Sequence, residues 1–410
     1  MHILFVTPNL PVPTSSARVR PHNLIKQLAV RHQVSLLSFM QSSERAMLEQ
    51  LRPFCQGLRL VPLDDFRELG KWQNRVRGWS LLLFGSRPRA LYTFPVHVMR
   101  QPLRDVLQRW GPDVIHFEQL YLAELGIDVA PMPAVLGEQN VEFQVLRNLG
   151  QVSSDPIRKI RDELSWRKMR AFEARMVQSF PVCLAVSETD ARHLRQLSGS
   201  TEVHVVENGV DSQAFDPAQS SLERRPDNVL FFGTLNYGPN RDGIQWFCRE
   251  VWPEVRKARS EASLEIVGID PPRDVMALAD IPGVRVTGFV PDIRAKLWTA
   301  TLSIAPLRWG GGTRLKILEA LAAGCPVVST TAGAEGLQLE DGKEIAIADT
   351  ADAFAQEVTD LLEHPGRRRE LASAGQRKVS QRYDWRSIAG ELEKAYARAI
   401  DLVASGAFVS

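Results

Sequence analysis

The sequence has few cysteines: only four occur among 410 residues, at positions 55, 183, 248 and 325. They form no CxxC pair, which excludes the metal and redox motifs built on that spacing. We therefore expect buried free thiols in a reducing compartment. Neither sign of charge dominates, because the formal net charge is +2, and this balance favours neither a nucleic acid nor a membrane as partner.

Long hydrophobic runs and two nucleotide-binding motifs are also missing. The longest apolar run in the first half, around residues 81–84, is too short to span a bilayer. The start, MHILFVTPNLPVP, has no basic leader and indicates a buried strand rather than a signal peptide, so we expect a soluble, cytoplasmic protein. No GxGxxG follows the first strand, which disfavours a nicotinamide dehydrogenase, and the absence of GxxxxGKS/T excludes a Walker A loop.

What the sequence does have is a regular alternation of short apolar runs and longer amphipathic segments, typical of a parallel sheet covered by helices. A chain of this length exceeds what one hydrophobic core usually supports, so we expect two doubly wound α/β domains. Gly, Ser, Pro and charged residues cluster between residues 199 and 228, where we place the join. The predicted strands lie at residues 3–7, 33–39, 58–62, 114–117, 134–137 and 182–186, then at 204–207, 229–233, 263–267, 284–287, 302–305, 327–330 and 345–348. The predicted helices lie at residues 21–31, 44–54, 100–109, 155–179, 241–257, 293–299, 314–323, 351–364 and 384–403.

The most informative stretch is GGGTRLKILEALAAGCPVVST, residues 310–330. A Gly-rich loop leads into a helix with Arg314 and Lys316 in its first turn, although a helix N-terminus is already partly positive. The backbone N–H groups of the loop, the helix start and the two cations form an anion site suited to phosphate. Glu319 lies one turn deeper on the same face and can accept two hydroxyl hydrogen bonds, as from a ribose diol.

Local signals set the limits of this helix. Thr313 can cap its start, Gly324 can end it in a left-handed conformation, and Pro326 prevents its continuation. The alternative is an ordinary Gly-rich loop before a helix with a Lys–Glu surface pair. The combination of glycines, early cations, a buried helix face and a following strand favours the ligand site.

This segment resembles the signature of retaining glycosyltransferases of family 4, which have the GT-B fold of two Rossmann-like domains facing an interdomain cleft. Further pieces match that family in the same order along nearly the whole chain, and RYDWRSIAGELEKAY resembles its closing helix. These pieces are LAVSETD at 184–190, VENGVDSQAF at 206–215, LFFGTLNYGPN at 230–240, LEIVGIDPP at 264–272 and VTGFVPDI at 286–293.

The resemblance implies an acceptor-side domain over residues 1–200, a nucleotide-sugar domain over 201–383, and a last helix over 384–410 that crosses back to the first domain. It implies that a sugar moves from a nucleotide-diphosphate sugar to a glycan, a lipid-linked or a small-molecule acceptor, with retention of anomeric configuration. Polysaccharide and cell-envelope synthesis is the implied setting. We expect no cofactor, and no nucleic-acid partner because no reader motif is present.

On the donor side, the resemblance makes Glu319 the second of two family glutamates and assigns it to the donor ribose. The first of that pair is replaced by Gly311, which removes the carboxylate that usually touches the donor sugar. The N–H groups of Gly311, Gly312 and Thr313 can still bind sugar or phosphate oxygens. The family's Arg and Lys after the first strand of this domain are also missing, so we expect Lys316 to carry the diphosphate charge. The other donor-side candidates are Arg314, Thr234, Asn240 and Arg241.

The acceptor-side candidates follow predicted strands of the first domain, where doubly wound folds bind ligands. TPNLPVPTSSARVR, at 7–20, takes the place of the family's Gly-rich loop, and its arginines either contact a phosphate or are solvated at a domain edge. We name His116 and Glu118 as catalytic candidates beside Lys316, with a structural role for His116 as the alternative. The acceptor-side candidates are Ser15, Ser16, Arg18, Arg20 and Asn140, and Glu138 and Glu142 lie in the same region.

The implied chemistry places most of the work on charge stabilisation and orientation. The acceptor hydroxyl attacks the face from which the diphosphate departs, and a leaving phosphate oxygen takes the proton. No DxD-type metal motif is suitably placed, because Asp64 and Asp65 lie in a polar connection. We therefore expect no metal requirement.

Three alternatives stay open. Residues 67–109 carry nine basic and two acidic residues with two tryptophans and LLLF, which favours either peripheral contact with the inner face of an anionic membrane or a buried helix with a solvated basic edge. Gly311 and Gln139 favour a catalytically weak GT-B partner or scaffold in polysaccharide assembly. Another nucleotide-sugar enzyme of the same fold, such as a 2-epimerase, is the third.

Overall fold

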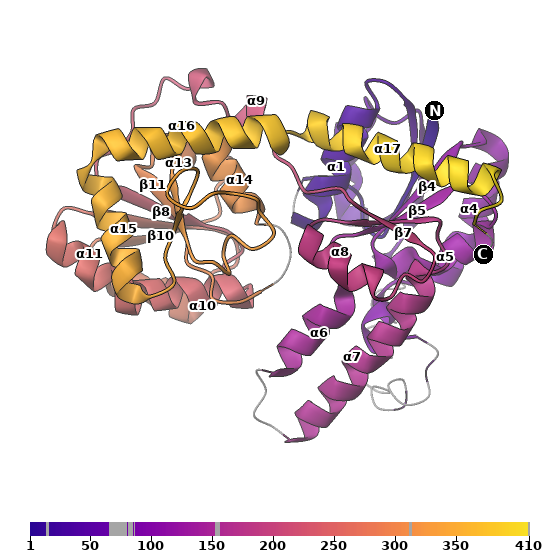
Figure 1. Ribbon diagram of the computed structural model, residues 1–410, viewed down its shortest axis with the longest axis horizontal. Helices are drawn as coiled ribbons and strands as arrows, with labels where there is room; N and C mark the ends of the chain where they lie inside the picture. Colours follow the sequence, from indigo (N-terminus) through magenta and orange to yellow (C-terminus); the bar gives the residue numbers. More distant parts are fainter. Residues whose placement is uncertain are drawn as a thin grey trace. The chain divides into compact units, whose positions relative to one another are not determined.

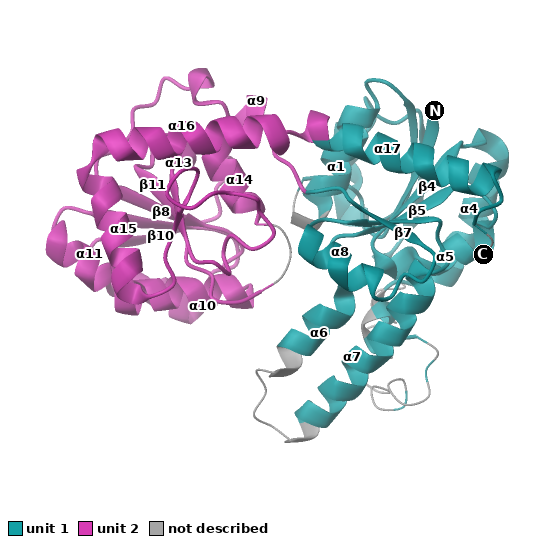
Figure 2. Cartoon of the chain, in the orientation of Figure 1, with its two compact units in different colours: residues 1–207, 388–410 teal, residues 208–387 magenta. Residues whose placement is uncertain are grey.

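The protein is seen in a computed structural model that describes residues 1–13, 16–64, 80, 85, 87–151, 156–310 and 314–408. The chain forms two compact units: unit 1 is residues 1–207 with 388–410, and unit 2 is residues 208–387 (Figure 2). Each unit contains a parallel sheet with its own helices (Figure 1). The predicted α/β class with two doubly wound domains is therefore confirmed.

Unit 1 is built on a seven-stranded sheet of order β3-β2-β1-β4-β5-β6-β7, in which all neighbours are parallel. Connections run outward in both directions from β1 and β4, and in such sheets ligands bind at the carboxyl ends of the strands beside that switch point. The strands are β1 (His2–Thr7), β2 (Gln33–Met40), β3 (Gly57–Pro62), β4 (Val114–Glu118), β5 (Ala134–Glu138), β6 (Val182–Ala185) and β7 (Glu202–Val205). The α-helices are α1 (Ser16–Leu28), α4 (Val96–Trp110), α5 (Glu124–Val129), α6 (Glu142–Gln151), α7 (Pro156–Val177), α8 (Glu188–Arg195) and most of α17 (Trp385–Ala404), and η1 (Ser42–Gln50), η2 (Arg89–Thr93) and η3 (Leu120–Leu122) are short 3-10 helices.

Unit 2 is built on a six-stranded parallel sheet of order β10-β9-β8-β11-β12-β13, with its switch point between β8 and β11. The strands are β8 (Asn228–Phe232), β9 (Ser263–Val267), β10 (Val284–Gly288), β11 (Leu302–Ala305), β12 (Val327–Ser329) and β13 (Ala346–Ile347). The helices are α9 (Ser212–Phe215), η4 (Pro217–Gln219), α10 (Gly238–Trp246), the π-helical segment η5 (Phe247–Val251), α11 (Trp252–Ala258), α12 (Arg273–Met276), η6 (Ala277–Asp280), α13 (Arg294–Thr299), α14 (Leu315–Ala322), α15 (Ala351–Glu363) and α16 (Pro365–Arg382).

The sheet of unit 2 has an apolar core on each face. Along β8, Val229 and Phe231 belong to the core that includes side chains of α10, α11 and α15, whereas Leu230 and Phe232 belong to the core with α14 and α16. Figure 1 shows α10 and α11 on one side of this sheet and α14 and α16 on the other. Because successive side chains of a strand point to opposite faces, a strand buried on both faces is apolar throughout, which is why NVLFF was recognisable.

The bounds of the predicted strands all lie within two residues of the observed ones, but several helices differ. The strand expected at 204–207 is β7, which extends the sheet of unit 1 instead of opening the second half. The helix expected at 44–54 is the 3-10 helix η1, and the one expected at 241–257 is interrupted by the π-helical η5. The structure adds α16, whose buried residues Leu371, Gly375 and Val379 form only a narrow stripe among charged residues. So narrow a stripe gives a weak helical periodicity in the sequence.

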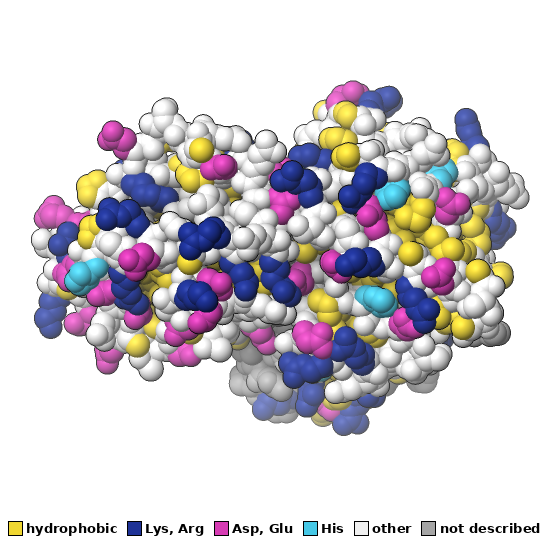
Figure 3. Space-filling view, turned by 45° about the horizontal axis from the view of Figure 1, so that its top comes forward, with side chains coloured by type: hydrophobic (Ala, Val, Ile, Leu, Met, Phe, Trp, Pro, Cys, Tyr) yellow, Lys and Arg dark blue, Asp and Glu magenta, His cyan; other side chains and the backbone are white. Residues whose placement is uncertain are grey.

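The four cysteines are buried and free, as the absence of CxxC pairs predicted. Among the described helices, none combines the length and the apolar character needed to cross a membrane. On the face drawn in Figure 3, Lys and Arg side chains are interspersed with Asp and Glu over both units.

Gly268 → Ala tests the packing that brings β8 and β9 together at their carboxyl ends. A Cβ at Gly268 would lie 1.7 Å from the carbonyl oxygen of Gly233, which is backbone and cannot rotate away. We expect the free energy of unfolding of unit 2 to fall by about 3 kcal/mol, the upper range for overpacking. Urea unfolding followed by tryptophan fluorescence measures it. Gly366→Ala is the matched control, because a Cβ there meets nothing within 4 Å, and a similar loss in both variants would contradict the expectation.

Candidate functional site

Three of the residues predicted on the donor side meet at the carboxyl end of β8, beside the switch point of unit 2. The Lys316 ammonium, on α14, donates to Oδ1 of Asn240 on α10 at 2.7 Å. The Asn240 amide in turn donates from Nδ2 to the carbonyl oxygen of Thr234 at 2.9 Å. The structure therefore brings Lys316, Asn240 and Thr234 into one hydrogen-bonded group, although 76 residues separate Asn240 from Lys316.

Two neighbours that sequence reasoning did not name complete this group. The ring of Phe231 lies under the Lys316 ammonium, with its centroid 4.5 Å from Nζ, a cation–π contact. Gly233 has φ +148°, and a Cβ there would lie 2.9 Å from Asn240 Nδ2 and 3.0 Å from Lys316 Nζ. The sequence did contain a signal for Gly233, since it directly follows the strand NVLFF. A glycine at such a position often marks a place where another group closely approaches the backbone.

The electrostatics of the group leave its cation weakly compensated. Burial and, to a lesser extent, the charge of Arg314 lower the pKa of Lys316 to about 7, against the opposing effect of Glu319. Burial likewise raises the pKa of Glu319 to about 7, against the charge of Lys316. An anion bound at Lys316 would favour the ammonium form, so the geometry and charge suit a phosphate-bearing ligand.

Arg314 precedes α14 and is buried. Its side chain hydrogen-bonds to Tyr237, and burial lowers its pKa. Gly310, with φ +122°, packs closely against Arg314 and Pro239, which fixes this end of the loop to the start of α10. Three predicted donor-binding residues, Gly311, Gly312 and Thr313, lie outside the described residues. The predicted end of the helix is confirmed, because Gly324 has φ +62°.

Arg241 does not join the Lys316 group. Its guanidinium pairs with Asp274 of α12 at 2.6 Å, and about half of its side chain is exposed. Thr234 takes part through its backbone carbonyl rather than through its hydroxyl. Fewer of the predicted donor-side residues therefore lie together than the sequence suggested. Lys316 contacts Asn240, Glu319 lies on the same helix as Lys316, and Arg314 directly precedes that helix.

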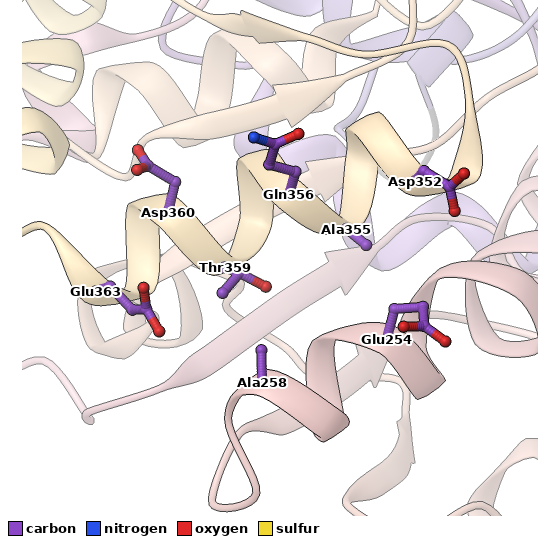
Figure 4. A pocket seen from close by; sticks show the side chains of 8 residues that line it. All are labelled: Glu254, Ala258, Asp352, Ala355, Gln356, Thr359, Asp360 and Glu363. Atoms are coloured by element: carbon purple, nitrogen blue, oxygen red, sulfur yellow. The ribbon is translucent and has the colours of Figure 1, made fainter.

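A surface pocket of unit 2 lies elsewhere and has the opposite electrostatic character. It has a volume of about 430 Å³ between α11 and α15, and Glu254, Asp352, Asp360 and Glu363 line it (Figure 4). Four carboxylates disfavour the binding of a diphosphate in this pocket. Among the described residues, no group of three or more His, Cys, Asp or Glu is arranged to hold a metal ion.

In unit 1, the two further catalytic candidates form a buried network at the end of β4. His116 is fully buried, with Nε2 2.8 Å from Glu118 Oε2 and Nδ1 2.7 Å from the Tyr396 hydroxyl of α17. Gln139 donates to the other Glu118 oxygen at 2.8 Å, and Arg20 Nε lies 3.8 Å from it. Burial raises the pKa of Glu118, but the hydrogen bonds and charges of its partners outweigh burial and leave it below the ordinary value. The network supports the structural alternative for His116, and its catalytic role stays a prediction.

The acceptor-side candidates are dispersed. Arg20 is buried and donates to the Glu207 carbonyl at 2.9 Å, and Arg18 pairs with Glu44 of η1. Asn140 is partly buried in the loop between β5 and α6. Ser16 begins α1, and Ser15 lies outside the described residues. Contact of these residues with an acceptor stays a prediction.

Three carboxyl groups gather on the opposite face of the sheet from His116. Glu173 accepts the backbone N–H groups of Glu142 and Phe143, at 2.9 and 3.0 Å, and so caps the start of α6. Burial raises the pKa of Glu173 to about 8 and that of Glu142 to about 7. Burial and the neighbouring carboxylates raise the pKa of Glu138 well above its ordinary value, and its Oε1 has no hydrogen-bond partner among the described residues.

Solved structures share this architecture over nearly the whole chain. A sucrose-phosphate synthase from Thermosynechococcus elongatus superposes with a TM-score of 0.69 at 17% identity, over 99% of this chain and 100% of that one. HepE from Anabaena, in complex with UDP and glucose, gives a TM-score of 0.65 at 16% identity, over 97% and 99%. Two parallel-sheet α/β units of this kind make up the GT-B fold.

Sequence comparisons then give the family. The model Glycosyltransferase Family 4 matches residues 18–214, and the model Glycosyl transferases group 1 matches residues 226–364. Glycogen synthase of Mycobacterium tuberculosis is 25% identical over 356 residues, which cover 84% of this chain and 81% of that protein. A phosphatidyl-myo-inositol mannosyltransferase of Mycobacterium leprae is 29% identical over 221 residues, 52% of this chain and 58% of that one. The chain belongs to glycosyltransferase family 4 and is a glycosyltransferase.

The buried carboxyl groups predict a pH dependence of stability. Because folding raises their pKa values, the folded state binds more protons than the unfolded state between about pH 4.5 and 8, and the free energy of unfolding falls as pH rises through that window. In Glu138→Gln we expect the fall in Tm from pH 6 to pH 8 to be smaller than in the wild type by a few degrees. The matched control is Glu49→Gln, whose side chain is 77% exposed. Identical pH dependence in all three proteins would contradict the prediction.

Proposed function

We propose that this glycosyltransferase moves a sugar from a nucleotide-diphosphate sugar to a glycan, a lipid-linked or a small-molecule acceptor, with retention of anomeric configuration. The observation that carries the proposal is the Lys316 ammonium, held by Asn240 at the carboxyl end of β8 in the unit matched by the group 1 model. Structures of Anabaena HepE with UDP and with UDP-glucose support a nucleotide-sugar donor.

Each donor-side residue has a role in this proposal. Lys316 and the start of α14 stabilise the charge that develops on the leaving diphosphate, as preorganised groups do in a water-poor site. Glu319 accepts the hydroxyl hydrogens of the donor ribose. The acceptor hydroxyl attacks from the side on which the diphosphate departs: its oxygen bonds to the anomeric carbon, the bond from that carbon to the phosphate oxygen breaks, and this phosphate oxygen takes the hydroxyl proton. The protein then needs no nucleophile of its own.

The residues described above concern the donor, so the class of acceptor is considered from the relatives and from the basic segment 67–109. The relatives' names include one that refers to a glycan, glycogen, and one that refers to a lipid, phosphatidyl-myo-inositol. In the basic segment 67–109, residues 67–79, 81–84 and 86 lie outside the described residues. The described helix α4 buries Val96, Met99, Leu103 and Val106 and so supports the alternative of a buried helix with a basic edge. Peripheral membrane contact stays a hypothesis.

A catalytically weak GT-B partner in polysaccharide assembly is the second candidate function. It is favoured by Gly311, which stands where the family resemblance expects a glutamate on the donor sugar. Binding of a nucleoside diphosphate without transfer of a sugar would support it. A screen of UDP-, GDP- and dTDP-sugars by thermal shift and by product formation separates the two functions, because bound ligand raises Tm whether or not transfer follows.

Substitution of the donor-side pair tests the site. We expect Lys316→Ala to lower kcat/KM for the donor by about 100- to 1000-fold, the effect of removing one group that stabilises transition-state charge. Glu319→Ala should mainly raise the donor KM, because a ribose contact is the same in ground and transition states. Steady-state kinetics with circular dichroism as a fold check measure both. Lys343→Ala, at a side chain 62% exposed, is the control, and wild-type turnover in both site variants would overturn the assignment.

Product analysis tests the chemistry. We expect the glycosidic bond formed to have the same anomeric configuration as the donor, read from proton coupling constants of the product by NMR. We also expect transfer to continue in excess EDTA, because charge stabilisation is assigned to Lys316. An inverted product would contradict retention, and activity lost in EDTA and restored by Mg²⁺ would contradict metal independence.

A further inference from the structure

We propose that Asn240 is a positioning residue, which holds the Lys316 ammonium at the end of β8 while leaving its positive charge for the donor. This inference rests on the proposed function, in which Lys316 meets the diphosphate. It also changes the role of Asn240, from a group that binds the donor to one that acts through Lys316.

The hydrogen bonds of Asn240 fix which way its amide faces. Asn240 is buried, and its Nδ2 donates to the Thr234 carbonyl, a group that can only accept. Its Oδ1 is therefore left facing Lys316 Nζ, which in the ammonium form can only donate. A flipped amide would face a carbonyl with its oxygen and an ammonium with its N–H groups, so the observed orientation is the one that satisfies both partners.

An amide is the side chain that suits this position. Its oxygen orients the ammonium through a hydrogen bond but carries no full negative charge, so the cation is not neutralised. An aspartate here would pair with Lys316 and repel the diphosphate, and an alanine would leave the ammonium without this acceptor. The neutral amide thus keeps Lys316 in place and available at the same time.

The surroundings make the charge of Lys316 depend on its ligand. Arg314, before α14, disfavours the ammonium, Glu319 of α14 favours it, and the partner from α10 is the neutral Asn240. The neighbour from β8 is the ring of Phe231. With the pKa of Lys316 at about 7, an arriving diphosphate recruits a proton above neutral pH. Donor binding is therefore coupled to proton uptake, and Asn240 sets the position at which this occurs.

A labelling experiment tests the role of Asn240 without reference to activity. The rate at which acetic anhydride modifies Lys316 in the ligand-free protein is followed against pH by mass spectrometry, and the midpoint reports the pKa of that lysine. We expect the midpoint near pH 7 in the wild type, at clearly higher pH in Asn240→Asp, and displaced from the wild-type value in Asn240→Ala. Asn236→Asp is the matched control: Asn236 is an exposed asparagine in the loop before α10, 3.5 Å from Asp270, and its replacement should leave the midpoint unchanged.

Kinetics of the same variants give the second measurement. Asn240→Ala should lower kcat/KM about 100-fold, as a misplaced catalytic group does. Asn240→Asp should raise the donor KM and move the alkaline limb of the pH profile to higher pH. Circular dichroism and Tm check folding, and if Asn240→Asp does not fold, the midpoint in Asn240→Ala tests the proposal alone.

The outcomes separate this inference from the function on which it rests. A Lys316 midpoint that is the same in wild type and in the folded Asn240 variants overturns the positioning role, even if transfer is active. A midpoint that moves as expected, in a wild-type protein that neither binds nor turns over any nucleotide sugar, overturns the proposed function and leaves the positioning of Lys316 by Asn240 in place.

Discussion

The hydrogen bond from Lys316 to Asn240 is the interaction on which the organisation of the donor side depends. It joins the first turn of α14 to the first turn of α10, so it can form only where the crossovers after β8 and β11 begin beside each other. It also requires the β8 backbone to pass within reach of both side chains, which Gly233 permits. The cation sits where helix dipole, burial and Arg314 all oppose it. A cation so placed is stabilised fully only when an anion binds.

The buried charged groups of unit 1 differ from Lys316, because their charges are compensated by neighbouring groups. His116, Glu118 and Arg20 are also buried and charged or polar, but each has its partners within the unit, and Tyr396 ties the group to α17. A buried polar network with all its members satisfied makes a structure rigid and specific. A buried network that contains an under-compensated charge is stabilised when a ligand of opposite charge binds to it. This criterion favours a binding role for Lys316, as proposed, and a structural role for His116 in the contact between β4 and α17.

Much of the fold could be predicted because parallel strands buried on both faces leave unbroken apolar runs, as in residues 229–232. The helix α16 could not, because its buried side chains are few and the rest are charged. In the site, Lys316 and Glu319 were predictable from one short segment. The partnership of Lys316 with Asn240 was not, since it depends on the order of strands in the sheet and not on spacing along the chain. Arg20 is likewise buried in the folded unit, and no local pattern around residue 20 indicates this burial.

The family resemblance expects a glutamate where this sequence has Gly311, and the replacement also changes the charge of this segment. A glutamate at that position would stand three residues before Arg314 in the sequence and bring a permanent negative charge to the start of α14. Such a charge favours the ammonium form of a nearby lysine and competes with a diphosphate for it. With glycine instead, Glu319 is the carboxylate that favours the charged form of Lys316, and its own pKa is raised to about 7. Under the proposed function, the donor then supplies the counter-charge that a glutamate would otherwise provide, and the neutral amide of Asn240 holds the lysine without replacing that charge.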